Sequence, residues 1–188
     1  MHWITEQSSR YDLVCLTGDF IDTRITCTHN AQQQASNLRE WFRNIQATLF
    51  VCSGNHDFVD NSLAWLKSDD KKWFGDGDQE CIHGLRVASL GYEDYHFEKL
   101  SDCDVLLTHV PPANTSVATQ HASDFGCPQL RAALKSKIIT PGHLLCGHVH
   151  SPRKHAIKLG KTIVSNPGGN HGEEHPSYCT LEILESGL

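Results

Sequence analysis

Four short clusters of polar residues have the composition of metal ligands, and each follows an apolar stretch of the chain. The clusters are Gly18-Asp19, Gly54-Asn55-His56-Asp57, Thr108-His109 and Gly147-His148-Val149-His150. Carboxylate, carboxamide and imidazole side chains together suit Mn, Fe, Zn or Ni, without selecting strongly among these ions. The chemistry that such a site predicts is metal-assisted hydrolysis, in which bound cations lower the pKa of a water molecule and stabilise developing charge.

The apolar stretches before these clusters have the pattern of buried strands. We expect strands at 11–17, 48–52, 104–108 and 143–146, and a further strand at 81–90. Apolar residues at helical spacing predict a crossover helix at 31–45, and Pro128 suits the first turn of a helix at 128–137. Alternating strands and helices indicate an α/β fold, in which loops at the carboxyl ends of parallel strands share one edge. The four clusters can therefore converge at that edge.

Length and composition fit one domain with an ordinary core. The chain has 188 residues, of which 39% are hydrophobic, so we expect residues 1–188 to form a single domain without a separate cap domain. Segments 154–160, 161–169 and 177–184 alternate apolar and polar residues. This alternation predicts antiparallel strands, with Gly160-Lys161 as a turn.

Charge and cysteine content restrict the partners and the compartment that we expect. A formal net charge of -6 disfavours binding to a nucleic acid duplex or an anionic membrane, because such partners select basic faces. No apolar run approaches the roughly 20 residues that span a bilayer, and the N-terminal residues lack the pattern of a signal peptide. The 8 cysteines include no CxxC pair, which argues against a zinc ribbon. Cysteines inside apolar strand-like stretches behave as small hydrophobic residues when reduced, which favours a reducing compartment; these are Cys15, Cys52, Cys146 and Cys179. We therefore expect a cytoplasmic protein, whose oligomeric state the sequence leaves open.

In their order along the chain, GD, GNHD, TH followed by two prolines, and GHVH resemble the motifs of the calcineurin-like metallophosphoesterase family. The similarity runs from about Tyr11 to the C-terminal end and includes SNPGG at 165–169, which is similar to the NPG turn of the family. The resemblance implies a four-layer α/β/β/α sandwich with a dimetal site at the sheet edge. It also implies hydrolysis of a small phosphomonoester or phosphodiester, with nucleotides as one candidate class, by metal-activated water.

The resemblance assigns metal ligands motif by motif. Asp19 would bridge the two metal ions, and Asn55, His109 and His148 would complete one of the sites. His150 would belong to the other site. The expected cofactors are therefore two divalent metal ions.

Two residues of the GNHD motif receive catalytic roles from the same resemblance. His56 would lie beside the scissile phosphate, as a charge stabiliser or as the acid for the leaving group. Asp57 would orient His56 by accepting a hydrogen bond from its ring, as general acid catalysis requires of a supporting carboxylate.

One departure from the family concerns the second metal site. The family begins with a strand that ends in Asp-x-His, and no residue before Asp19 reproduces this motif. We therefore expect a sandwich that lacks the usual first strand, with one complete site and one impaired site. His2 and Glu6 are weak candidates as substitutes.

Three alternatives stay open beside the phosphoesterase hypothesis. A catalytically impaired member could act as a binding or scaffold protein, as the retromer scaffold subunit of this family does. A DNA nuclease, also known in the family, is disfavoured by the acidic charge balance. The stretch His171-Gly172-Glu173-Glu174-His175 could bind metal, although it cannot present the helical HExxH face. Substrate choice would depend on the loops at 22–30 and 111–126.

Overall fold

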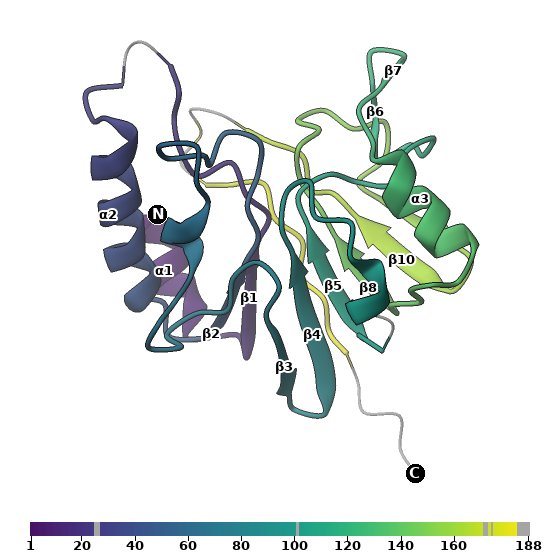
Figure 1. Cartoon of the computed structure of the whole chain (residues 1–188), viewed down its shortest axis with the longest axis horizontal. Coiled ribbons are helices and arrows are strands. Elements are labelled where there is room, and N and C mark those ends of the chain that lie inside the picture. Colours follow the sequence, from purple (N-terminus) through teal and green to yellow (C-terminus); the bar gives the residue numbers. More distant parts are fainter. Residues whose placement is uncertain (25–26, 101, 171–172, 174, 184–188) are drawn as a thin grey trace.

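Two β-sheets lie face to face between helices, which gives four layers (Figure 1). The computed structural model describes residues 1–24, 27–100, 102–170, 173 and 175–183. In the first two layers, helices α1 and α2 cover a sheet made of β1 and β2. A larger sheet and helix α3 form the other two layers. The bounds of these elements are α1 (His2–Ser8), β1 (Leu13–Leu16), α2 (Ala31–Arg43), β2 (Thr48–Val51) and α3 (Pro128–Lys135).

The larger sheet has the strand order β3-β4-β5-β8-β10-β9. Its four inner strands run parallel, while β3 and β9 pair antiparallel at the two edges. Their bounds are β3 (Gln79–Ile82), β4 (Leu85–Leu90), β5 (Val105–Thr108), β8 (His143–Leu145), β9 (Ala156–Leu159) and β10 (Thr162–Ser165). Strands β1 and β2 of the smaller sheet are also parallel. The parallel strands therefore bring the loops at their carboxyl ends to a shared edge of each sheet.

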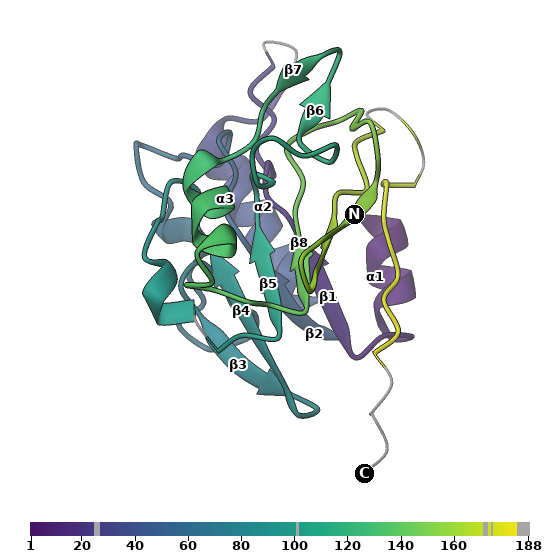
Figure 2. The same ribbon diagram turned by 90° about the vertical axis from the view of Figure 1, so that its right-hand side faces the viewer.

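Short elements complete the described chain. Figure 2 shows the hairpin of β6 and β7 standing above the larger sheet. Two 3-10 helices, η1 and η2, lie in the loops that follow β2 and β4. Their bounds are η1 (Ala64–Leu66), η2 (Phe97–Leu100), β6 (Thr119–Gln120) and β7 (Ser123–Asp124).

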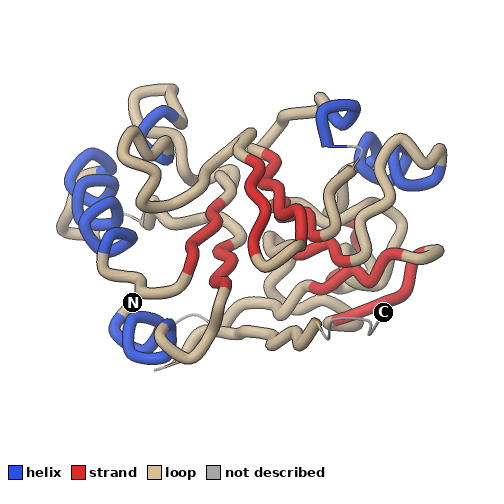
Figure 3. Tube along the Cα trace, turned by 90° about the horizontal axis from the view of Figure 1, so that it is seen from below, coloured by secondary structure: helices blue, strands red, loops and turns tan. Residues whose placement is uncertain are grey.

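Apolar side chains fill each of the three spaces between layers. Phe50, Val87 and Leu107 belong to the cluster between the two sheets. Phe42 lies in the cluster beneath α2, and Leu130 of α3 lies in the cluster on the far face of the larger sheet. Figure 3, viewed from below, shows the helices on both flanks and the strands between them. The α/β/β/α arrangement confirms the fold class that the motifs imply.

Helix α2 begins at a capping box. The side chain of Asn30 accepts a hydrogen bond from the Gln33 backbone N–H, and the Gln33 side chain accepts one from the Asn30 backbone N–H. These two bonds satisfy donors that the first turn of a helix otherwise leaves unpaired. Ala35, Leu38 and Phe42 form the buried face, in agreement with the predicted helix, which ends two residues earlier than expected at Arg43.

The structure corrects two of the predicted strands. The stretch 81–90 contains a turn at His83-Gly84, where both residues have positive φ, so β3 and β4 form a hairpin instead of one strand. Positive φ at both central residues matches the twist of two-residue hairpins. Residues 177–183, all within the described part of the chain, form no strand. The alternation there does not mark a buried face, because Tyr178, Leu181 and Ile183 are all exposed.

The N-terminal segment forms α1, which packs against the smaller sheet through Ile4. The ring of Trp3 contacts Tyr178, with centroids 4.9 Å apart, so the C-terminal segment lies beside α1 (Figure 2). In the part of the chain that the structure describes, no helix combines the length and the hydropathy of a membrane-spanning segment.

Candidate metal centre

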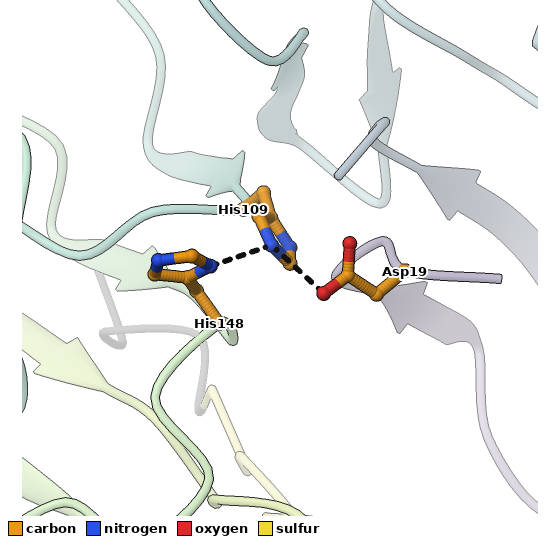
Figure 4. Close-up of side chains that lie close together, drawn as sticks. All are labelled: Asp19, His109 and His148. Carbon is orange, nitrogen blue, oxygen red and sulfur yellow. Dashed lines mark hydrogen bonds and ion pairs between the residues drawn. The ribbon is translucent and has the colours of Figure 1, made fainter. Parts of the chain in front are cut away.

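Four of the predicted ligands come together from the ends of four strands. Asp19 follows β1, Asn55 follows β2, His109 directly follows β5, and His148 follows β8. Figure 4 shows the side chains of Asp19 and His148 on either side of the His109 ring. Asp19, His109 and His148 each offer a ligand atom within 4.8 Å of the others. The convergence that the strand pattern predicts is therefore present for these residues.

The His109 ring lies at the centre of this cluster. Its Nε2 is 3.0 Å from Asn55 Oδ1 and 3.1 Å from His148 Nδ1. The same nitrogen is 3.3 Å from Asp19 Oδ2. His109 itself is 2% exposed, whereas Asp19, Asn55 and His148 are partly exposed, so the cluster has a buried centre and a side open to solvent.

The hydrogen bonds of His109 show that the cluster fits a cation. Its Nδ1 lies 2.6 Å from the Thr17 carbonyl oxygen, and because a carbonyl only accepts, Nδ1 carries a proton. In the neutral ring Nε2 then carries a lone pair. This nitrogen faces the oxygens of Asn55 and Asp19 and a nitrogen of His148. Two oxygens and two imidazole nitrogens gathered in this way can bind a positive ion between them. A ligand histidine whose other nitrogen donates to a carbonyl is the usual arrangement in metal sites.

Asp19 is held in an unusual backbone conformation at the centre. Its φ is 61°, a region that few residues other than glycine adopt. Its Oδ1 accepts a hydrogen bond from the His56 backbone N–H at 3.0 Å, which leaves Oδ2 facing His109. A Cβ on Gly54 would lie 2.3 Å from Asp19 Oδ1. Only glycine at position 54 therefore allows the carboxylate to lie this close to the chain.

Asp57 accepts hydrogen bonds from four backbone N–H groups. Its Oδ2 accepts from Asp19 at 2.8 Å and from Gly54 at 2.7 Å. Its Oδ1 accepts from Phe20 at 2.6 Å and from Ile21 at 3.1 Å. Asp57 is fully buried, and it joins the loop after β1 to the loop after β2.

The family resemblance implies that Asp57 accepts a hydrogen bond from the His56 ring, whereas the four donors to Asp57 are backbone N–H groups. The His56 ring is exposed, and its Nδ1 lies 3.2 Å from the Thr23 hydroxyl instead. Two donors already occupy each oxygen of Asp57, which matches the capacity of a carboxylate. Asp57 therefore orients the backbone around Asp19, and Thr23 is the residue placed to orient the His56 ring.

The loop that carries His148 is also strained. The Val149 N–H donates to the Gly147 carbonyl at 2.7 Å, and His148 between them has a φ of 64°. A hydrogen bond across three residues with positive φ at the middle one is the rarer, strained form of the γ-turn. The side-chain amide of the buried Asn166 donates to Gly147 at 2.9 Å and to Val149 at 3.2 Å. Asn166 thus holds both ends of the turn.

Electrostatics favour the ligand forms of these side chains. Burial alone would raise the pKa of Asp19, but when the His109 ring is protonated, as it can be without a bound cation, its hydrogen bond and charge outweigh burial and the pKa is lowered. Burial and the neighbouring His109 lower the pKa of His148 to about 4. Asp19 is therefore a carboxylate and His148 a neutral imidazole near pH 7, the forms that bind metal. Burial raises the pKa of Asp57, against the opposing effect of its N–H donors.

Other predicted ligands lie outside the cluster of Asp19, Asn55, His109 and His148. The exposed His150 has its ring against Gly169, where a Cβ would come within 3.3 Å of it. His2 and Glu6 pair with each other on the exposed side of α1, at 3.1 Å. Of the stretch 171–175, residues 171, 172 and 174 lie outside the described residues, and the ring of His175 contacts Trp3.

The sequence patterns missed Asn166 and the Thr17 carbonyl. Asn166 lies in the SNPGG stretch, so its motif was visible while its hydrogen bonds were not. The Thr17 contribution comes from a backbone atom and leaves no trace in residue type.

Comparisons with known proteins identify the fold family. The profile of the calcineurin-like phosphoesterase family matches residues 1–152. The structure of TT1561 of Thermus thermophilus is 13% identical, with a TM-score of 0.56, and the match covers 87% of this chain and 80% of that chain. A comparison with curated proteins gives no match.

Two other solved structures are less similar to this chain. A novel archaeal phosphodiesterase is 18% identical, with a TM-score of 0.47 and coverage of 88% of this chain and 72% of that chain. GAP50, the anchor in the inner membrane complex of Plasmodium, is 13% identical, with a TM-score of 0.42 and coverage of 90% and 75%. Because the family profile matches residues 1–152, which are most of this chain, the chain belongs to the calcineurin-like phosphoesterase family.

Proposed function

We propose that this chain is a metal-dependent phosphoesterase that hydrolyses a small phosphomonoester or phosphodiester. The observation that carries the proposal is the set of acceptors around His109 Nε2, drawn from four strand ends of a phosphoesterase fold. Carboxylate, carboxamide and imidazole side chains gathered around one point form a ligand set that suits a divalent cation.

In this proposal Asp19, Asn55, His109 and His148 hold one divalent ion. A divalent ion bound there would polarise a phosphoryl oxygen and lower the pKa of a water molecule. The Thr17 carbonyl fixes the His109 ring at 2.6 Å, and the His56 backbone N–H fixes one carboxylate oxygen of Asp19. These bonds set the positions of the ligands before any ion arrives, which reduces the reorganisation that binding requires.

We assign His56 to the leaving group of the substrate. Its backbone is tied to Asp19, while its exposed ring lies beside Thr23. A ring held at one nitrogen by a hydroxyl can present the other to a leaving oxygen, as a proton donor or as a neutralising charge. His150 lies outside the Asp19, His109 and His148 cluster, so we assign it to a second, weaker ion.

The first test measures metal content and hydrolysis together. Elemental analysis gives ions per chain, and turnover of bis-p-nitrophenyl phosphate and p-nitrophenyl phosphate is measured with added Mn²⁺. We expect at least one bound ion and Mn²⁺-dependent turnover. A chain that binds neither ion nor substrate would instead favour the scaffold function.

Two variants separate ligand binding from catalysis. We expect His148→Ala to lose most of its Mn²⁺ affinity, because it removes one of the donors facing His109. We expect His56→Ala to keep its Mn²⁺ content and to lose about 100-fold or more in kcat, the lower range for general acid catalysis. Unchanged turnover of His56→Ala would contradict the role assigned to His56.

A further inference from the structure

We propose that a cavity beside the metal centre, here called the ring pocket, binds an uncharged aromatic ring attached directly to the phosphate of the substrate. This inference rests on the proposed function, because it assigns the substrate class of the same site. His109 and His148 are among the residues that line the ring pocket. A group in the pocket therefore lies directly beside the candidate ligands.

The size of the ring pocket suits one ring. Its volume is about 240 Å³. Benzene fits an apolar cavity of about 150 Å³, whereas pockets that hold whole drug-sized ligands span roughly 300–1,000 Å³. The volume thus matches a single planar group.

Aromatic side chains form part of the wall of the ring pocket. Buried Leu90 and Leu130 contribute to its lining. The Tyr92 ring packs edge-on against His109, with centroids 6.2 Å apart and an angle of 72°. The aromatic lining residues are Tyr92, Tyr95, Phe97 and Phe125. Aromatic rings attract one another in edge-to-face or offset arrangements beyond the effect of buried area alone, so this lining favours a ring over an alkyl chain.

Backbone hydrogen bonds fix two of these walls in place. The backbone N–H of Phe125 donates to the Ala118 carbonyl at 2.9 Å. Two residues later, the N–H of Cys127 donates to the Pro111 carbonyl at 2.7 Å. The Tyr92 N–H donates to the hydroxyl of buried Ser53 at 2.8 Å. Walls that are already ordered lose little conformational entropy when a ligand enters.

The charges of the ring pocket disfavour a second anionic group. Glu93 and Asp94 line it, and among the described lining residues there is no lysine or arginine. Asp94 accepts hydrogen bonds from the backbone and ring of His96, at 3.0 and 2.7 Å, and so it remains in place. A carboxylate or second phosphate on the substrate would meet repulsion there. These charges therefore favour a ring that carries no negative charge.

The test compares ligands that share one head group. Phenylphosphonate and methylphosphonate carry the same phosphonate, and neither has an ester bond that the protein could hydrolyse. Their affinities are measured by calorimetry on the full chain loaded with Mn²⁺. We expect phenylphosphonate to bind about tenfold tighter or more, since only its ring buries apolar surface in the pocket. We expect 4-carboxyphenylphosphonate to lose this advantage.

Variants locate the preference in the ring pocket. Phe125→Ala should bring the phenyl-to-methyl affinity ratio towards one and leave methylphosphonate binding unchanged. Tyr92→Ala should also bring the ratio towards one. Phe125 is 47% exposed, so its truncation should not impair folding, and it decides the test if Tyr92→Ala does not fold. Tyr11→Ala removes an exposed ring outside the pocket and should keep the wild-type ratio.

The outcomes separate this inference from the proposed function. Mn²⁺-dependent hydrolysis together with equal affinities for the two phosphonates would overturn the ring pocket and leave the phosphoesterase intact. A phenyl preference that Phe125→Ala removes would support the ring pocket even if hydrolysis were undetectable. A preference that survives both variants would overturn the assignment.

Discussion

At the scale of single residues, two candidate ligands have strained backbone conformations, and neighbouring side chains hold each of them by hydrogen bonds. Asp19 and His148 both have positive φ, which costs on the order of 1–3 kcal/mol for residues other than glycine. Each is held by a buried polar side chain that is not itself a candidate ligand: Asp57 for Asp19, and Asn166 for His148. A strained backbone conformation persists only where several surrounding interactions hold it in place.

Replacement of Asp57 by asparagine tests this support. Asn keeps the size of the side chain, but its amide donors would face two of the backbone N–H groups that now donate to Asp57. A buried donor without an acceptor costs about 1–3 kcal/mol. We therefore expect Asp57→Asn to lower the free energy of unfolding by at least about 2 kcal/mol, measured by urea denaturation.

Asp60→Asn is the matched control for this variant. Asp60 is exposed and accepts one side-chain hydrogen bond, from Gln32 at 2.7 Å. We expect its free energy of unfolding to change by less than about 0.5 kcal/mol, as is usual at exposed sites. Equal losses in the two variants would contradict the role of Asp57.

At the scale of elements, three segments far apart in the sequence meet at the loop after β8. The Asn166 amide donates to the carbonyl of Val117, near the hairpin of β6 and β7, and to those of Gly147 and Val149. Asn166 directly follows β10, which is the parallel neighbour of β8. The register of these two strands therefore determines the position of His148.

We predict that Asn166→Ala weakens metal binding. Without the amide, the γ-turn around His148 loses two of its bonds and can relax from positive φ. Residues that orient metal ligands typically contribute 10- to 100-fold in affinity, so we expect the Kd for Mn²⁺ to rise by about tenfold or more. Calorimetric titration measures this change at a temperature where the variant is folded.

Asn170→Ala provides the comparison in the same segment. Asn170 is exposed and bonds to the backbone of His175 and Ser177. Its loss should leave the Kd for Mn²⁺ unchanged, whereas an equal weakening would show that the whole segment, and not Asn166, governs the centre.

At the scale of the whole molecule, the candidate ligands come from both sheets. Asp19 and Asn55 follow strands of the smaller sheet, while His109 and His148 follow strands of the larger one. A bound ion would therefore add a link between two layers that already meet through apolar packing, such as that of Phe50 against Val87, and through the hydrogen bond of His109 to the Thr17 carbonyl. Folding and metal binding should be coupled.

This coupling predicts a rise in Tm with Mn²⁺. A ligand that binds only the folded state adds about 2.7 kcal/mol when its free concentration is 100 times its Kd. Wild type and His2→Ala should show the same rise in Tm, because His2 is not one of the assigned ligands. It lies on α1, with its Nε2 3.1 Å from Glu6 Oε1. His148→Ala should show little rise, and loss of the rise in His2→Ala would contradict the assigned ligand set.

Much of the fold followed from patterns in the sequence. The apolar stretches at 11–17, 48–52, 104–108 and 143–146 all contain strands, and the capped helix lies where its periodicity placed it. The patterns failed at 81–90 and 177–183. In the first, a His-Gly turn interrupts the apolar run; in the second, apolar and polar residues alternate without burial. Periodicity indicates which face of a segment is apolar. A strand also needs a neighbouring strand to which its backbone can hydrogen-bond.

The sequence by itself determined which residues stand at the ends of parallel strands, and hence that Asp19, Asn55, His109 and His148 could meet. Residue type and local order carry that information. Only the tertiary structure decided that Asp57 supports Asp19 instead of the His56 ring, that Asn166 holds the turn of His148, and that aromatic side chains surround a cavity beside the centre. The physical reason is that a buried polar group bonds to whichever donor or acceptor the packing of layers brings near.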